Sequence, residues 1–158
     1  MKPRQIRLAG ILVLSLALFS AGATAQETAQ APSTDDQSSV IGCLRTINTA
    51  ELAYAKAYNN GFNPNLKALS VPDQGTNYTA SAAGLIDASL GGGKRNGYVF
   101  TYKAGAPDDH GKISSYTVSA RPAKWQTGVR NFFTDQTGVL RLTTENRAAT
   151  AKDPDMDK

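Results

Sequence analysis

The first segment whose residue types could do chemistry surrounds the single histidine. Asp108, Asp109 and His110 are followed by Gly111, and two carboxylates beside an imidazole could hold a cation. Their spacing matches no established metal-binding loop, whereas Asp and Gly close together are typical of a β-turn. The segment also lies between two strand-like stretches. We therefore expect a hairpin loop here rather than a metal site.

The second segment, Gly91-Gly92-Gly93-Lys94, resembles a phosphate-binding loop at first sight. Such a loop follows a strand, opens a helix and contains Gly-Lys followed by Ser or Thr. Here the glycines follow a helix-like stretch, Lys94 is followed by Arg95, and no helical pattern begins. The segment therefore predicts no nucleotide site.

One histidine and one cysteine make a catalytic nucleophile and base pair implausible. A Ser-His-Asp or Cys-His arrangement needs a third positioned group, and His110 lies in an expected loop. Cys43 cannot form an intramolecular disulfide, and it lies among apolar neighbours in a helical pattern. We expect a buried thiol, with an intermolecular bridge as the alternative. Nothing in these residues asks for an enzyme, a cofactor or a metal.

Aromatic side chains are the remaining candidates for binding. Six of them fall in strand-like stretches and could form a stacking platform: Tyr98, Phe100, Tyr102, Tyr116, Phe132 and Phe133. Aromatic rows on a sheet more often pack against a helix, so we expect these six in the core. Trp125 is different because it follows Pro122 and Lys124 in a polar segment. It is the candidate surface contact residue.

An amphipathic helix must organise the chain around these residues. Its apolar residues recur at steps of three, four and seven, near one stripe of a 3.6-residue period: Val40, Leu44, Ile47, Tyr54 and Tyr58. Ser38 or Ser39 can cap its first turn, and residues 59–61, Asn-Asn-Gly, should end it. Such a stripe needs a sheet or another helix to cover it.

Strand signals fill the second half of the chain. Four stretches are strand-like: residues 97–104, 113–120, 131–134 and 139–142. Turn-rich segments at 105–112 and 135–138 favour antiparallel hairpins, and residues 81–90 resemble a short second helix. The expected fold class is α+β, with one long N-terminal amphipathic helix packed on an antiparallel sheet of about three to four strands.

The N-terminal residues have the three parts of a secretory signal peptide. A basic opening with Lys2, Arg4 and Arg7 precedes the apolar run at residues 8–19, and Ala23-Thr24-Ala25 is a small-x-small cleavage site. The run is shorter than the about 20 residues that a membrane-spanning helix needs. We therefore predict a signal peptide at 1–25, a mature start at Gln26 and export to the periplasm or the medium. An uncleaved membrane anchor is the alternative.

Export changes the charge of the chain. The whole sequence has a formal net charge of +4, but residues 1–25 hold three of its 17 basic residues and none of its 13 acidic ones. The chain from Gln26 onward therefore carries only +1. A strongly basic net charge would be the main argument for a nucleic acid or an anionic membrane as a partner, and this chain does not have one after export.

Two polar segments flank the expected domain. Residues 26–37 contain Pro32 and no apolar period, and residues 145–158 are charged and contain Pro154. We expect a disordered linker and a disordered tail at these places. The folded part is then one domain at residues 38–144.

Five segments, in this order, resemble the head region of bacterial type IV pilin-like proteins and type II secretion pseudopilins. They are SVIGCLRTINTAELAY at 39–54, NGFNPNL at 60–66, SAAGLID at 81–87, GYVFTY at 97–102 and FFTDQTGVLR at 132–141. The resemblance covers nearly all of the expected domain. It implies a helix packed on an antiparallel sheet of about four strands, a structural role in a filament or pseudopilus, and neither catalysis nor a cofactor.

The N-terminus departs from that family. A prepilin has a short basic leader, a Gly cleavage point, Phe-Thr-Leu-Ile-Glu and a long apolar half-helix that anchors the subunit and later forms the filament core. Here Gly10 is followed by residues 11–15, Ile-Leu-Val-Leu-Ser, with no glutamate at the fifth place. The apolar run then ends in a polar segment. This chain lacks the usual prepilin N-terminal motif.

Three functional hypotheses follow. The first is an exported, non-enzymatic pilin-like domain that binds protein, such as pilus, secretion or cell-envelope components. The second retains the apolar segment and makes the chain a membrane-anchored minor pilin or pseudopilin. The third is a secreted small-molecule or glycan binding module that uses Trp125 and the loops around Asp108.

Overall fold

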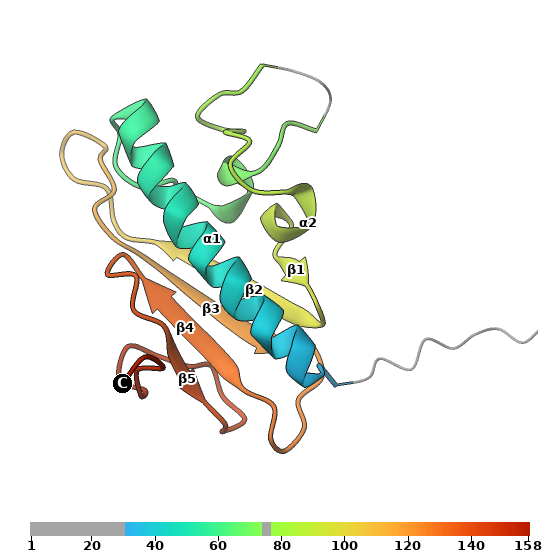
Figure 1. Ribbon diagram of the computed structural model, residues 1–158. Helices are drawn as coiled ribbons and strands as arrows, with labels where there is room; N and C mark the ends of the chain where they lie inside the picture. Colours follow the sequence, from blue (N-terminus) through green and yellow to red (C-terminus); the bar gives the residue numbers. More distant parts are fainter. Residues whose placement is uncertain (1–30, 74–76) are drawn as a thin grey trace, which may run out of the picture.

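The computed structural model describes residues 31–73 and 77–158, in which one long helix crosses one face of an antiparallel sheet (Figure 1). Helix α1 covers Thr34–Tyr58. The irregular connector after it contains the 3₁₀ helix η1 (Leu66–Leu69) and helix α2 (Ala88–Gly91). Five strands follow: β1 Lys94–Arg95, β2 Tyr98–Ala104, β3 Tyr116–Pro122, β4 Asn131–Asp135 and β5 Arg141–Thr143. The α+β class expected from the sequence is confirmed.

The sheet is a meander with the order β1-β2-β3-β4-β5, and every neighbouring pair is antiparallel. Its longest pair joins β2 and β3 from Tyr98↔Pro122 to Ala104↔Tyr116. The sequence predicts three to four strands, and the structure has five. The additional strand is β1, whose two residues are both charged and therefore give no alternation of apolar and polar side chains.

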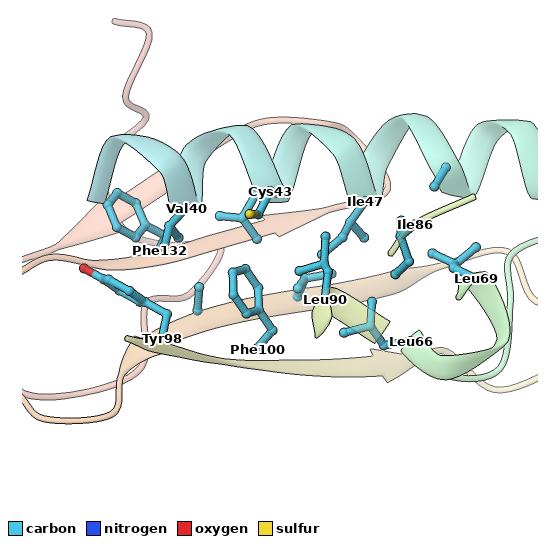
Figure 2. Close-up of a cluster of buried hydrophobic side chains, with 14 of the residues drawn as sticks. Val40, Cys43, Ile47, Leu66, Leu69, Ile86, Leu90, Tyr98, Phe100 and Phe132 are labelled. Atoms are coloured by element: carbon cyan, nitrogen blue, oxygen red, sulfur yellow. The ribbon is translucent and has the colours of Figure 1, made fainter. Parts of the chain in front are cut away.

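The apolar stripe of α1 faces the sheet and forms the centre of the core. Val40, Leu44 and Ile47 have no exposed surface. Figure 2 shows Val40, Cys43 and Ile47 directed from the helix toward side chains of the sheet and connector. Burying an aliphatic side chain of this size contributes roughly 1.5–3 kcal/mol, so these residues account for much of the attachment of the helix.

Helix α1 begins five residues before the start that the nearer predicted cap, Ser38, would give. Its N-cap is Ser33, whose side chain accepts a hydrogen bond from the Asp36 backbone N–H at 3.1 Å, while the Asp36 carboxylate accepts from the Ser33 N–H at 2.8 Å. This reciprocal pair is a capping box, and it outcompetes the later candidates Ser38 and Ser39. The expected linker at 26–37 is therefore helical from Thr34. Residues 1–30, with the expected signal peptide, lie outside the described residues.

The end of α1 is where the sequence predicts it. Asn59 is the C-cap in the left-handed conformation, and its N–H donates to the Ala55 carbonyl at 3.1 Å. Gly61 follows with φ +72°, and a Cβ at this position would lie 2.1 Å from the Ile113 carbonyl oxygen. Only glycine lets the chain pass this close, and the Phe62 N–H then bonds to the same oxygen at 2.8 Å.

The second helix is shorter than predicted. The sequence suggests a helix over residues 81–90, but only Ala88–Gly91 are helical. Gly84 has φ +69°, and a Cβ there would lie 2.3 Å from the Tyr78 ring, so the chain bends where a helix would need to continue. The residues before α2 instead bond to η1 and to the residue after it; the Leu85 N–H, for example, donates to the Leu69 carbonyl at 2.7 Å.

The C-terminal segment 145–158, expected to be disordered, is packed against the end of the sheet. The Leu142 N–H donates to the Pro154 carbonyl at 3.1 Å, and the Met156 N–H donates to the Leu140 carbonyl at 3.0 Å. The prediction of a disordered tail was therefore wrong. It rested on amino-acid composition, which does not indicate backbone hydrogen bonds to β5. These bonds also cover an edge that would otherwise be open to another strand.

An ion pair between the exposed Arg147 and the buried Asp153 holds this segment in its fold. The Arg147 guanidinium donates to both carboxylate oxygens of Asp153, at 2.8 and 2.5 Å, and the Thr150 N–H donates to the same carboxylate at 2.7 Å. These bonds, with Arg147 the largest cause, hold the pKa of Asp153 well below its usual range. Asp153 and Ala149 are both buried as a result.

Two leucines on α1 test the packing directly. Leu44 has no exposed surface, whereas Leu52 is 64 % exposed on the same helix. We expect Leu44→Ala to lower the free energy of unfolding by about 2–5 kcal/mol, because it leaves a cavity between helix and sheet. Leu52→Ala should change it by less than about 0.5 kcal/mol. Urea unfolding followed by circular dichroism measures both, and equal effects would contradict this packing.

Candidate functional site

Trp125 lies on the face of the sheet opposite α1. It is half-buried in the loop after β3 and lines an open depression of about 430 Å³ with side chains of β2, β3 and the C-terminal segment: Val99, Thr101, Arg121, Pro122, Ala123 and Asn146. The candidate contact residue from the sequence is therefore at the surface. It forms one wall of a depression on the sheet.

Strand register decides which residues share this depression. Phe100 and its partner Ala120 are buried beneath α1, so their neighbours Val99 and Arg121, which pair with each other, point to the opposite face. The loop that carries Trp125 is tied back to the start of β2 by the Ala123 N–H, which donates to the Gly97 carbonyl at 2.8 Å. Hence the indole is held beside the exposed side of β2 and β3.

The depression offers hydrogen-bond donors. The Arg121 guanidinium donates to the Asn146 side-chain oxygen at 3.2 Å, and it makes no ion pair within residues 31–73 and 77–158. The Trp125 ring N–H has no acceptor among the described residues, but it is hidden from solvent, so Arg121 is the donor that a ligand could reach. An arginine and an indole in this arrangement can bind a carboxylate or an aromatic group.

The loop around His110 does not join this site. It connects the end of β2 at Ala104 to the start of β3 at Tyr116, whereas Trp125 follows the other end of the same pair. The two loops are therefore separated by the length of the hairpin, roughly 20 Å, and lie at opposite ends of the sheet in Figure 1. The structure does not bring Trp125 and Asp108 together, as a shared ligand site would need.

The Asp108 carboxylate instead forms the turn that the sequence predicts. It accepts the backbone N–H groups of His110 and Lys112 at 2.9 and 2.8 Å. In the part of the chain that the structure describes, no group of three or more His, Cys, Asp or Glu side chains could hold a metal ion. The glycines at 91–93 likewise precede strand β1 and no helix.

Cys43 and most of the aromatic set are core residues. Cys43 is 8 % exposed, and burial raises the pKa of its thiol, as expected for a packed side chain. Four aromatic residues belong to the cluster beneath α1 and are buried: Tyr98, Phe100, Tyr116 and Phe132. Tyr102 is half-buried at its edge. The prediction was wrong for Phe133, which is buried outside this cluster on the other face of β4, because it follows Phe132 directly and successive residues of a strand point to opposite faces.

Sequence reasoning missed a buried carboxyl group beneath the second half of α1. Glu51 has no exposed surface; it accepts the Asn63 side-chain amide at 2.7 Å and the Asn63 backbone N–H at 3.2 Å. The Tyr102 hydroxyl donates to the Asn63 carbonyl at 2.9 Å, so helix, connector and β2 meet at one point. Glu51 follows Ile47 by four residues and Leu44 by seven, and that position on the apolar stripe was the available signal.

This cluster fixes structure rather than binding a substrate, because the Glu51 carboxyl is closed to solvent. Burial raises its pKa to about 7, against the opposite effects of its polar neighbours Tyr102 and Asn63. A neutral, protonated Glu51 suits an apolar site and still accepts from Asn63. Burial of this carboxyl therefore costs least below neutral pH, where it is protonated.

No family model, no curated protein and no solved structure matches this chain. The resemblance to pilin-like heads therefore stays a prediction from the sequence. Among helices in the described ranges, 31–73 and 77–158, none has the length and apolar content needed to cross a membrane. The apolar run at 8–19 lies outside those ranges.

The pKa of Glu51 predicts how stability changes with pH. Between about pH 4.5, its ordinary value, and pH 7, the folded chain retains a proton that the unfolded chain has released. The free energy of unfolding should therefore fall as pH rises through this window, by roughly 3 kcal/mol. Glu51→Gln should remove this slope and be the more stable protein at pH 8. Urea unfolding at pH 4.5 to 8 tests this, and parallel curves for the two proteins would refute it.

Proposed function

We propose that this chain is an exported, non-enzymatic pilin-like head that acts as a structural or protein-interaction module. The observation that carries the proposal is the start of α1. Ser33 has an extended backbone, and its capping box with Asp36 closes the helix at this residue. In the family that the sequence resembles, the head helix instead continues an apolar half-helix. A helix that is capped at Ser33 does not continue into the residues before it, which favours a head that is free of its leader.

The apolar stripe of α1 is buried against the sheet, which supports a pilin-like head but does not distinguish a free head from an anchored one. A surface for protein contact is present on the opposite face of the sheet, where Trp125 and Arg121 line one depression. An aromatic residue and an arginine in an accessible depression are typical of protein contact surfaces.

The membrane-anchored minor pilin or pseudopilin stays as the second candidate. It shares the head and differs in retaining the apolar segment at 8–19, which the described residues do not include. A small-molecule or glycan binding module would now rest on Trp125 without the Asp108 loop. We therefore place protein binding first.

Site-specific photo-cross-linking in the producing cells tests protein binding. A benzophenone amino acid at position 124, beside Trp125, should capture a pilus, secretion or cell-envelope protein. The same group at position 67, on η1 and away from the Trp125 depression, is the matched control, since Lys67 is also exposed. Capture at 124 and not at 67 is the expected result. Recovery of no such protein from position 124 would count against the proposal.

A further inference from the structure

The exposed face of β1, β2 and β3 carries cations and no carboxylates. Strand pairing aligns Lys94, Val99 and Arg121 in one row across the three strands. Lys103 pairs with Thr117 farther along, and the next residue of that row, on β4, is Asp135. Val99 and Arg121 point away from α1, so residues in these rows do as well. Lys94, Lys103 and Arg121 make no ion pair with any described residue.

The net charge of the chain does not explain the cations on this face. From Gln26 onward the formal net charge is only +1, so unpaired cations on one face are not a consequence of a basic composition. Arg147 and Arg95 are paired with Asp153 and Asp87, whereas the two depressions beside Val99 are lined by Lys94 and Arg121 and by no carboxylate. A local field of this kind selects a partner of opposite charge.

The shape of the face is long and shallow. The depression beside Trp125 and a neighbouring one of about 500 Å³ share Val99 and Ala123, and Lys94 lines the second. Lys94 and Arg121 flank Val99 on adjacent strands, so their backbones lie roughly 10 Å apart. Three residues of an extended peptide span about the same distance.

We infer that this face binds an extended, acidic segment of a protein partner, with carboxylates at Arg121 and Lys94 and an apolar side chain beside Trp125. The inference rests on the proposed function and names the chemistry of the partner. Arg121 can receive a carboxylate on its planar guanidinium, and Val99 and the indole supply apolar surface between the cations. A membrane surface fits less well because the net charge of the exported chain is small.

The single tryptophan is a built-in reporter for the test. The probe is the peptide (Glu-Pro)₄, which is extended and has no aromatic residue, and (Gln-Pro)₄ is its neutral control. Titration into the protein at 0.05 M salt should give a saturable change in Trp125 emission with the acidic peptide alone. Binding should weaken when the salt is raised to 0.3 M.

Matched charge variants locate the site. Arg121→Gln should weaken binding at least fivefold and Lys94→Gln at least twofold, whereas Lys67→Gln removes the same charge elsewhere and should change affinity less than twofold. The inference would be overturned if the acidic peptide shows no saturable binding, or if Lys67→Gln weakens binding as much as Arg121→Gln does. It would also be overturned if (Gln-Pro)₄ binds equally well, or if only vesicles of anionic lipid give a response. If a cross-linked envelope protein binds Arg121→Gln as well as the unaltered chain, this inference fails and the proposed function stands.

Discussion

The contact between the apolar stripe of α1 and one face of the sheet is the constraint on which the described structure depends. The helix contributes Val40, Leu44 and Ile47, which have no exposed surface, and the sheet contributes Val118 and Phe132. Neither element could keep such a surface in water by itself. Once the helix occupies this face, strand register dictates which side chains remain for other contacts. The packing of the core thereby selects the surface that is available for binding.

The opposite face of the sheet is divided into two parts. On β4 and β5 it is occupied near the C-terminal segment, where the Asn131 side chain bonds to the Glu145 carbonyl at 2.8 Å and Phe133 is buried. On β1, β2 and β3 it is open, and Asn146 marks the boundary by bonding to Arg121. This arrangement protects one sheet edge and leaves a basic, aromatic depression on the other part. Under the proposed function, this open part of the face is where a protein partner would bind.

Much of the fold could be predicted because the spacing of apolar residues along a helix or strand indicates which side is buried. The stripe from Val40 to Tyr54 predicts the helix and its buried side. Strand alternation predicts that Tyr98, Phe100 and Tyr116 lie beneath the helix, whereas Phe133 was wrongly expected there. Features that depend on single hydrogen bonds were not predictable in the same way. The segment at 145–158 is held by Arg147 and backbone bonds, which have no period. Only part of the candidate site could be predicted. Trp125 stands out in the sequence, but its position beside Arg121 and Asn146 depends on strand register and on the packed C-terminal segment.

The most direct measurement is the intact mass of the mature protein recovered from the producing cells, combined with its distribution between the fluid released by osmotic shock and the membranes. An exported head that is free of its leader predicts the mass of residues 26–158, found in the released fluid. A mass that corresponds to residues 11–158, or to the whole chain, found in the membrane fraction would contradict a free head and favour an anchored pilin or pseudopilin.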